Sequence, residues 1–252
     1  QKAKQSLEKT NILLNDTLKK LEASNNIKNE FLGTISHELR TPVNGIIGTN
    51  SVLQTFDLPE DIKQFVKANS DSAKELMGLI DSMLQFIDAK SGSSEIELEK
   101  INLQSLMHTL SAYTYQKIEG SKLGFSVQNE IEEPLAIHGD RDKLITVLSI
   151  LVDNAAKYTI TGGITVRVSY SESGEEVVFT ISDTGIGIEK ELVDKIFDAF
   201  RQANGSSSRN FGGLGMGLTL AKVLVNNIGA RLDVKSKVGE GSNFMLTVPI
   251  NP

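Results

Sequence analysis

Apolar residues recur at helical spacing along the first part of the chain. Over residues 1 to about 26 they form a single seam, consisting of Leu7, Leu14, Leu18 and Leu21. The steps of three, four and seven residues are typical of a coiled coil, although a lone amphipathic helix would show them too. Asn11 and Asn25 fall on the same seam, where a buried Asn would fix the register at a cost in stability. We therefore expect residues 1–23 to form a coiled-coil helix.

The helical pattern continues past this segment and is interrupted once. Pro42 lacks a backbone donor, so we expect a kink just before it. The turn Asp57–Glu60 ends the first helix, and Pro59 suits the first turn of the next one. The second helix carries a heptad seam made of Ile62, Phe65, Asn69, Ser72, Leu76, Leu79, Met83 and Phe86.

Two long helices joined by a short turn predict a helical hairpin over residues 24–90. The core of one hairpin is narrow, so two copies would bury both seams by pairing into a four-helix bundle. We therefore expect a homodimer.

The second half of the chain mixes helical and alternating patterns after a linker at residues 91–99. Alternation predicts strands at residues 95–101, 123–129, 164–170, 177–182, 232–236 and 243–250. Helical spacing predicts helices at residues 103–118, 140–158, 192–200 and 218–228. Helices combined with antiparallel strands predict an α/β sandwich over residues 100–252, with one sheet covered on one face by helices.

Composition narrows the function classes. The 252 residues leave room for two domains, and 39% are hydrophobic. The net charge of −6 argues against a nucleic-acid binder, and the absence of Cys excludes disulfides, Cys-ligated zinc and thiol chemistry. No apolar run is long enough for a membrane span, so we expect no membrane contact by these residues. The chain opens inside a helical pattern, so we expect a piece of a longer protein.

Two glycine clusters predict a nucleotide pocket. Asp183 ends a β-branched run, and Gly185 and Gly187 let the backbone turn tightly next to it. A carboxylate at such a strand end can accept a hydrogen bond from an adenine amino group, although many ordinary turns share this pattern. The second cluster, at residues 212–217, precedes a helical pattern that starts at Leu218. Glycines there expose backbone N–H groups to phosphate, whereas the plainer interpretation is a flexible loop.

A third element lies at the end of the helix predicted for residues 140–158. Asn154 and Lys157 are three residues apart, so they share one helix face. An Asn oxygen suits Mg²⁺ and a Lys ammonium suits phosphate, although a solvated helix end would look the same. The polar segment at residues 203–210 predicts a lid over a bound nucleotide.

His37 is the candidate phosphoryl acceptor, within the segment Ser36–Pro42. These elements, in this order, resemble the sensor histidine kinases of two-component signalling, over nearly the whole chain from about residue 24. The motifs that carry the resemblance are residues 36–42, 151–159, 183–187, 197–200 and 213–218. The sequence Thr41-Pro-Val-Asn-Gly-Ile-Ile-Gly48 looks most like hybrid kinases, whose chains continue into a receiver domain.

The resemblance implies a function. Residues 24–90 would be the dimerisation and histidine phosphotransfer domain, and residues 100–252 the catalytic ATP-binding domain of the gyrase and chaperone class. The kinase would phosphorylate itself on His37 with ATP and Mg²⁺, and would pass the phosphoryl group to an Asp of a receiver domain on the same or another chain. The protein would be the cytoplasmic portion of a sensor anchored in the inner membrane.

The resemblance also assigns roles to single residues. Glu38 would orient His37 or accept its proton, Arg40 would pair with phosphate or a carboxylate, and Thr41 would align a water for phosphatase activity toward the receiver. Asn154 would bind Mg²⁺. The nucleotide-binding residues would be Asn154, Lys157, Tyr158, Asp183, Gly185, Gly187, Gly213, Gly215, Gly217 and Leu218.

One position departs from the family pattern. Ile150 stands where the family often has a second Asn, four residues before Asn154. Ile cannot ligate Mg²⁺, so metal affinity or kinase rate would fall unless Asn154 suffices. Two other interpretations remain: an ATPase or chaperone of the same nucleotide fold without a phosphohistidine, and a dimeric scaffold with an inactive ATP domain. His108 and His138 are rival acceptors, but each suits a surface or structural role better.

Overall fold

The structure, a computed structural model, describes residues 2–91, 96–131, 133–198 and 215–251. Before residue 33 it describes the helix but only some of the side chains. The chain divides into two compact units, Gln1–Ser93 and Ser94–Pro252. Each unit is considered by itself.

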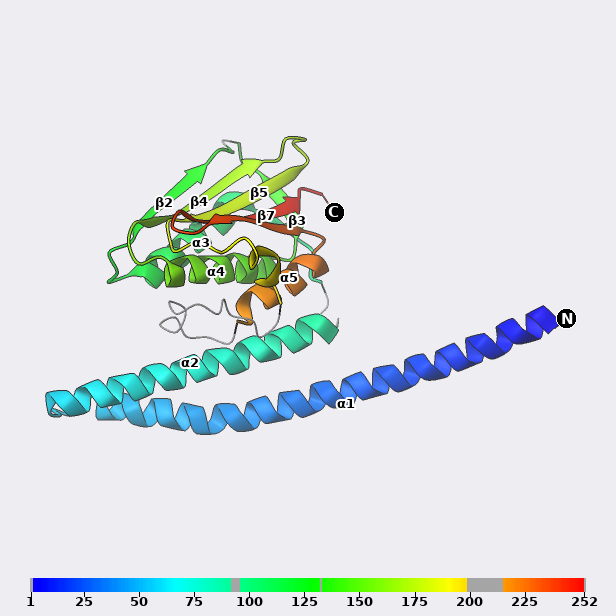
Figure 1. Ribbon diagram of the computed structural model, residues 1–252, viewed down its shortest axis with the longest axis horizontal. Coiled ribbons are helices and arrows are strands. Elements are labelled where there is room, and N and C mark those ends of the chain that lie inside the picture. Colours follow the sequence, from blue (N-terminus) through cyan, green and yellow to red (C-terminus); the bar gives the residue numbers. More distant parts are fainter. Residues whose placement is uncertain (1, 92–95, 132, 199–214, 252) are drawn as a thin grey trace. The chain divides into compact units, whose positions relative to one another are not determined.

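The first unit is a helical hairpin of α1 (Lys2–Leu53) and α2 (Glu60–Ser91). Helix α1 includes Pro42 and runs on past it without a break, curving along its length (Figure 1). Pro42 has no backbone N–H, so the helix has one hydrogen bond fewer there. Packing against α2 offsets this loss. The core between the helices consists of Val43, Ala73 and Ile80, with Ile47 and Met77 packed against it.

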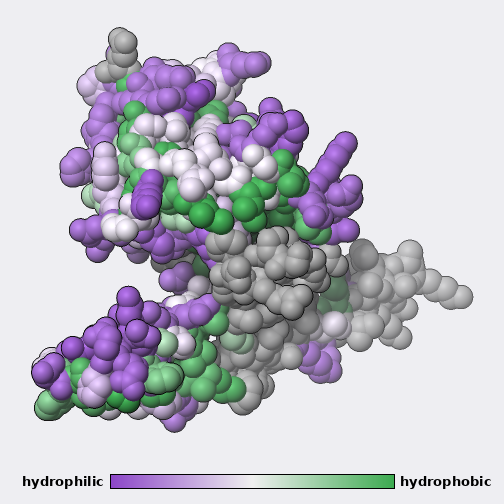
Figure 2. Space-filling model, turned by 60° about the vertical axis from the view of Figure 1, so that its left-hand side comes forward, coloured by the Kyte–Doolittle hydropathy of each residue, from purple (hydrophilic) through white to green (hydrophobic). Residues whose placement is uncertain are grey.

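Only part of the heptad seam read from the sequence of α2 faces α1: the amide of its member Asn69 donates to the side-chain oxygen of Asn50 at 3.4 Å. The seam members Ile62, Phe65 and Leu76 are exposed, while the face toward α1 is built on Ala73 and Ile80. Helix α2 therefore has two apolar stripes, one buried within the hairpin and one on its surface. Figure 2 shows apolar surface along the hairpin beside a strongly hydrophilic flank. In the coiled-coil segment, Leu14 is exposed, and the side chains of Leu7, Leu18, Leu21 and Asn25 lie outside the description.

The second unit is an α/β sandwich. Its main sheet has the order β2-β4-β5-β7-β6, and a two-stranded sheet pairs β1 with β3. The strands are β1 (Glu99–Asn102), β2 (Gly124–Asn129), β3 (Ala136–Gly139), β4 (Gly163–Tyr170), β5 (Glu176–Asp183), β6 (Arg231–Lys237) and β7 (Gly241–Pro249). The helices α3 (Leu103–Ile118), α4 (Arg141–Tyr158) and α5 (Gly217–Asn227) cover one face of the main sheet (Figure 1).

Alternation explains the covered face. Along β5, Val177, Phe179, Ile181 and Asp183 are buried, and the residues between them are only partly buried. The apolar side chains form the core between the sheet and the helices. Because side chains alternate along a strand, Asp183 at the end of β5 lies on the same face of the sheet.

Three expectations for this unit need correction. The strand pair β2–β4 is parallel, so the sheet is mixed and not purely antiparallel. Residues 192–200 were expected to form a helix, but up to Asp198 the structure has only a short 3-10 turn, Val193–Lys195. Strand β3 was not expected at all. Its four residues are too few to show a period in the sequence.

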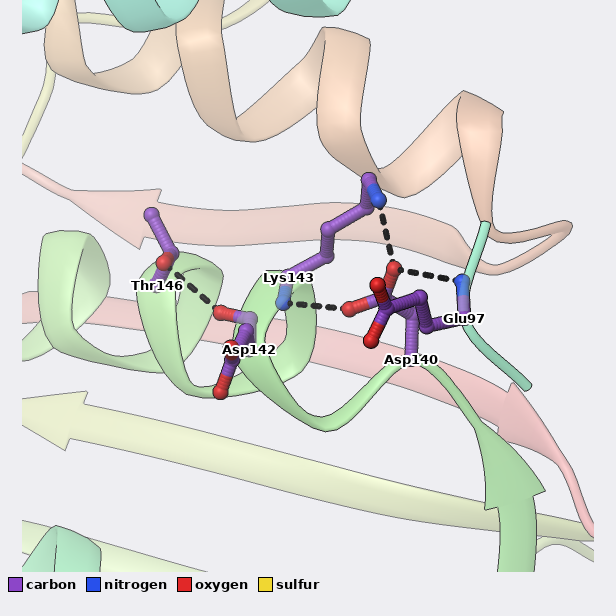
Figure 3. A network of polar contacts seen from close by, with 5 residues as sticks. All are labelled: Glu97, Asp140, Asp142, Lys143 and Thr146. Carbon is purple, nitrogen blue, oxygen red and sulfur yellow. Dashed lines mark hydrogen bonds and ion pairs between the residues drawn. The ribbon is translucent and has the colours of Figure 1, made fainter. Parts of the chain in front are cut away.

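The start of α4 is held by a polar network (Figure 3). Asp140 caps the helix by accepting the backbone N–H of Lys143 at 2.9 Å, and its other oxygen bonds to the Lys143 ammonium and to the N–H of Glu97. Burial by itself would raise the pKa of Asp140, but these hydrogen bonds outweigh it and hold the pKa below its usual value. The charged cap fixes the helix that carries Asn154 and Lys157.

Candidate functional site

His37 lies exposed on the surface of α1. The side chains of His37 and Glu38 are each 78% exposed, and His37 Nδ1 lies 4.0 Å from Glu38 Oε1. Ser36, one position earlier, is buried. Ser36 therefore faces the hairpin core, and His37 faces outward. An imidazole that attacks a phosphoryl group needs such an exposed position. The distance is too long for a hydrogen bond, but it leaves the carboxylate within reach of the imidazole by a rotamer change.

Arg40 and Thr41 are engaged within the hairpin. The guanidinium of Arg40 donates to Asp81 of α2 at 2.6 Å, so of the two partners expected for Arg40 the structure shows the carboxylate. The hydroxyl of Thr41 donates to the carbonyl oxygen of His37 at 3.2 Å. Thr41 is exposed and lies one turn after His37, so its oxygen stands near the imidazole on the outside of the helix.

The rival histidines lie in the other unit. His108 is exposed on α3, and His138 is exposed on β3, where its backbone N–H bonds to the carbonyl oxygen of Ile250. Their side chains have no described carboxylate partner comparable to Glu38.

Asn154, Lys157 and Tyr158 occupy the last turn of α4. The amide nitrogen of Asn154 is buried and has no hydrogen-bond partner among the described residues. A buried donor without a partner costs about 1–3 kcal/mol, so it indicates a place for an acceptor such as a phosphate oxygen or a bound water. The Lys157 ammonium lies 5.2 Å from the ring centre of Tyr158, whose pKa is raised by burial.

The neighbouring Asp153 ties this turn to α3. It accepts from the hydroxyl of Tyr113 and from the ammonium of Lys117, each at 2.8 Å. Burial and the contact with Asp153 raise the pKa of Tyr113 well above its usual value, so it stays a donor. These contacts fix the rotation of α4 and hence the direction of Asn154.

Asp183 is the last residue of β5, the middle strand of the main sheet, and lies next to the end of α4. Asp183 is 9% exposed, and its carboxylate accepts the backbone N–H of Gly185 at 2.8 Å. Burial raises its pKa, and hydrogen bonds from the backbones of Gly185 and Ser242 partly offset that effect. A carboxylate with spare acceptor positions in a nearly dry setting suits the amino group of a base.

The glycines of this loop are required by close backbone contacts. A Cβ on Gly185 would lie 2.4 Å from the carbonyl oxygen of Tyr158, and one on Gly187, whose φ is +70°, would lie 2.0 Å from that of Lys237. The N–H of Ile186 donates to the same Tyr158 oxygen at 3.2 Å. The loop after Asp183 is therefore bound directly to the end of α4, which brings Asp183, Asn154, Lys157 and Tyr158 to one place.

The second glycine cluster lies at the start of α5. Gly217 begins the helix, followed by Leu218, and Gly215 has a φ of +69°. A Cβ on Gly217 would approach Ile150 Cγ2 of α4 to 3.3 Å, so Ile150 packs against this helix start. Gly213 and the expected lid at residues 203–210 lie outside the described residues.

Sequence reasoning missed Ser242. It is buried, pairs with Asp183 across β5 and β7, and its backbone N–H supports the carboxylate. The signal was the run Gly239-Glu-Gly241-Ser242, a third glycine cluster that reads like a simple hairpin turn.

The polar groups gathered here are of the kinds that bind a nucleotide, and the side-chain oxygen of Asn154 is of the kind that binds Mg²⁺. No group of three or more His, Cys, Asp or Glu side chains that could hold a metal occurs among the described residues. Mg²⁺ keeps its waters and is commonly bound through one or two protein oxygens together with substrate phosphates, a role that Asn154 can fill. A cavity of about 780 Å³ lies elsewhere, along β6, and none of the predicted nucleotide residues lines it.

None of the described helices combines the length and apolar character that a membrane span requires.

Two known families match the chain. Residues 27–92 match the His Kinase A (phospho-acceptor) domain, and residues 139–252 match the histidine kinase-, DNA gyrase B- and HSP90-like ATPase. His37 falls in the first match, and Asn154 and Asp183 in the second. The phospho-acceptor match disfavours an ATPase or chaperone that lacks this domain.

Similar proteins have the same two parts. Sensor histidine kinase RcsC of Escherichia coli K12 is 34% identical over 229 residues, which are 91% of this chain and 24% of that protein. Sensor histidine kinase GacS of Pseudomonas protegens is 34% identical over 247 residues, 97% of this chain and 27% of that protein. The chain thus spans about a quarter of the length of these relatives. A crystal structure of full-length ShkA with AMPPNP covers 87% of this chain and 45% of that one, with a TM-score of 0.72 and 27% identity.

Proposed function

The chain belongs to the sensor histidine kinases, and from that premise we propose that it phosphorylates itself on His37 and passes the phosphoryl group to a receiver aspartate. The observation that carries the assignment is the position of His37. It is the histidine within the matched phospho-acceptor domain, its side chain is 78% exposed, and a carboxylate follows it directly.

In the first step, a nitrogen of the neutral imidazole attacks the γ-phosphorus of ATP in line. The new N–P bond forms as the bond to the β,γ-bridging oxygen breaks, and ADP leaves. The ring proton passes to Glu38 or to water. Asn154 would hold Mg²⁺ together with ATP, and the metal would supply neutralisation of the charge on the transferring group.

On the nucleotide side the residues divide by the group they contact. Asp183 accepts a hydrogen bond from the base, and the loop that contains Gly185 and Gly187 lies next to the base. Lys157 offers its ammonium to phosphate, Tyr158 lies beside the nucleotide, and the start of α5 at Gly215, Gly217 and Leu218 offers backbone N–H groups.

The direct test is labelling with [γ-³²P]ATP. His37→Ala should abolish acid-labile, alkali-stable label, while His108→Ala and His138→Ala, both exposed positions of the other unit, should keep it. Acid-labile label on the His37→Ala protein would show that the acceptor is a different residue.

We further propose that the chain removes phosphate from the receiver through Thr41. Its hydroxyl stands one turn from the imidazole and can align a water on the phospho-aspartate. Thr41→Ala should leave autophosphorylation intact and slow receiver dephosphorylation. The matched control is Thr49→Ala on the same helix, where the hydroxyl likewise bonds to the carbonyl four residues back, at 2.8 Å. Equal slowing in both variants would assign the effect to the helix and not to Thr41.

Three wider statements belong to the same proposal. The protein works as a homodimer through the exposed stripe of α2. Its receiver lies on the same polypeptide, as in hybrid kinases, or on a separate protein. The complete protein is a membrane-anchored sensor with these residues on the cytoplasmic side, and the chain binds neither nucleic acid nor the membrane itself.

A further inference from the structure

The hydroxyl of Ser236, near the end of β6, makes three hydrogen bonds to separate parts of the nucleotide-binding unit. It accepts the backbone N–H of Ile188 at 2.8 Å, from the end of the loop that begins at Asp183. It donates to the carbonyl oxygen of Gly241 at 2.9 Å and lies 3.0 Å from the hydroxyl of Ser242. Ser236 itself was not among the residues that the sequence motifs indicated.

The positions of the protons follow from these three contacts. A serine hydroxyl has one proton and two acceptor positions. The carbonyl of Gly241 can only accept, so it takes the proton of Ser236. The hydroxyl of Ser242 must then donate to Ser236, which fills the second acceptor position beside the Ile188 N–H. All three hydrogen-bonding positions of Ser236 are used.

Ser236, Ser242 and Asp183 lie side by side on three neighbouring strands. Ser236 pairs with Ser242 across β6 and β7, and Ser242 pairs with Asp183 across β7 and β5. The backbone N–H of Ser242 supports the Asp183 carboxylate. Ser236 is therefore one residue removed from Asp183 and does not touch it.

The turn between β6 and β7 packs directly against the loop at residues 183–188. The N–H of Gly239 donates to the carbonyl of Ile186 at 2.8 Å. A Cβ on Gly241, whose φ is +100°, would lie 1.9 Å from the carbonyl oxygen of Asp183. The Asp183–Ile188 loop thus rests on the turn, and Ser236 is the side chain that joins the two.

We propose that Ser236 is a positioning residue for nucleotide binding, which holds the Asp183–Ile188 loop and Ser242 in the arrangement that presents the Asp183 carboxylate to the base. The proposal rests on the proposed binding of ATP. Removing the hydroxyl leaves the Ile188 N–H and the Gly241 carbonyl without their partner and frees Ser242 to turn. The base-binding end should loosen, while the phosphate-binding end at Lys157 and α5 keeps its contacts.

The test uses Ser236→Ala in the full 252-residue chain. By calorimetry, ATP and ADP should both bind about tenfold more weakly, and by the same factor, because the defect lies at the base end. The KM for ATP in autophosphorylation should rise by a similar factor with kcat unchanged within about twofold. The amide proton of Ile188 should exchange faster with solvent.

Two variants make the result specific. Ser236→Thr keeps the hydroxyl and should restore binding. Ser126→Ala is the matched control, because Ser126 forms a comparable 2.9 Å hydroxyl pair with Thr165 between β2 and β4 of the same sheet. ATP binding by Ser236→Ala within twofold of the native chain, or no recovery in Ser236→Thr, would overturn the positioning role. A native chain that bound neither ATP nor ADP would instead overturn the proposed function.

Discussion

Asp183 combines two opposing demands at the scale of a single residue. Burial destabilises its charged form, while hydrogen bonds from two backbone N–H groups stabilise it in part. The balance leaves the pKa above its usual value. Because burial shields the remaining acceptor positions of this carboxylate from solvent, a hydrogen bond from a nucleotide base would be stronger there than at an exposed aspartate.

A pH dependence of nucleotide binding follows from the raised pKa of Asp183. In its proposed role the charged carboxylate accepts from the base, so ATP affinity should fall as the pH falls through this pKa, by up to about tenfold per pH unit. The fall should begin at a higher pH than for an ordinary aspartate. The same proton stabilises the folded chain, since a raised pKa adds stability at low pH that is lost as the pH rises.

The measurement is the ATP dissociation constant by calorimetry across the acidic range, with Asp183→Asn as the control. The control should bind weakly at every pH and lack this slope, while titration of ATP itself remains in both proteins. Identical pH profiles for the two proteins would rule out Asp183 as the titrating acceptor.

Ile150 is the residue at which the ATP side departs from the family pattern, and the structure gives it a packing role. It lies one turn before Asn154 and contacts the start of α5 at Gly217. Ile150→Asn adds an amide oxygen near the metal position and should strengthen Mg²⁺-dependent ATP binding about three- to tenfold. The loss of apolar packing should lower the free energy of unfolding by about 1 kcal/mol.

Calorimetric titration of ATP with and without Mg²⁺ checks this expectation, and a urea melt checks the stability. Ile150→Val, which keeps an apolar side chain, should bind as the native chain does. If Ile150→Asn also binds like the native chain, Asn154 suffices for the metal. If the native chain binds no ATP and Ile150→Asn does, the scaffold interpretation of this particular chain gains support.

At the scale of elements, the apolar period predicted the five α-helices of the described residues, was wrong about a helix at residues 192–200, and did not show which faces pack together. A heptad seam on α2 was plain from Ile62 to Phe86, yet the face that packs on α1 runs through Ala73 and Ile80. Both stripes obey the same spacing, and the smaller side chains of the inner one made it less visible. The period therefore shows that a face is apolar, without showing which neighbour covers it.

The sheet shows what periodicity can and cannot predict. Strands β4, β5 and β7 alternate over eight or nine residues and were expected close to their observed bounds. Strand β3 has four residues, and the direction of β2 depends on pairing with β4, which lies far along the chain. At the site, Asp183 and Asn154 stood in recognisable motifs. Ser236 makes cross-strand contacts that leave no local pattern, and Ser242 follows a glycine run that looks like an ordinary hairpin turn.

The exposed stripe of α2 makes a prediction about assembly. Ile62, Phe65 and Leu76 are 41%, 71% and 47% exposed, and burying them against a second hairpin would stabilise a dimer by the hydrophobic effect. Leu76→Glu should place a charge in that interface and raise the dimer dissociation constant at least about a hundredfold. Sedimentation over a dilution series measures the change.

Val52→Glu is the control for this assembly test. Val52 is 57% exposed on α1, the helix that does not carry this stripe. Its substitution should leave the dimer intact. A dimer unaffected by Leu76→Glu would place the interface on another face of the hairpin.

At the scale of the whole molecule, the chain consists of two units with separate cores. The hairpin has the core of Val43, Ala73 and Ile80, and the second unit has its own core beneath the sheet. The proposed phosphoryl acceptor and the proposed nucleotide residues therefore lie on different units. Transfer requires them to meet, and the segment between the units keeps their mutual concentration high.

Separating the units tests how much the connection contributes. The fragment 94–252 should bind ATP as the full chain does, since every described residue proposed to contact ATP lies within it. Alone it should take up no acid-labile label, and addition of fragment 1–93 should restore labelling on His37. A short covalent connection supplies an effective concentration on the order of millimolar, so fragments mixed at about 10 μM should react roughly a hundredfold more slowly than the intact chain. The rate should rise in proportion to the concentration of fragment 94–252. A rate equal to that of the intact chain and insensitive to dilution would mean that the units bind each other stably, and the connection would then serve only to keep them on one polypeptide.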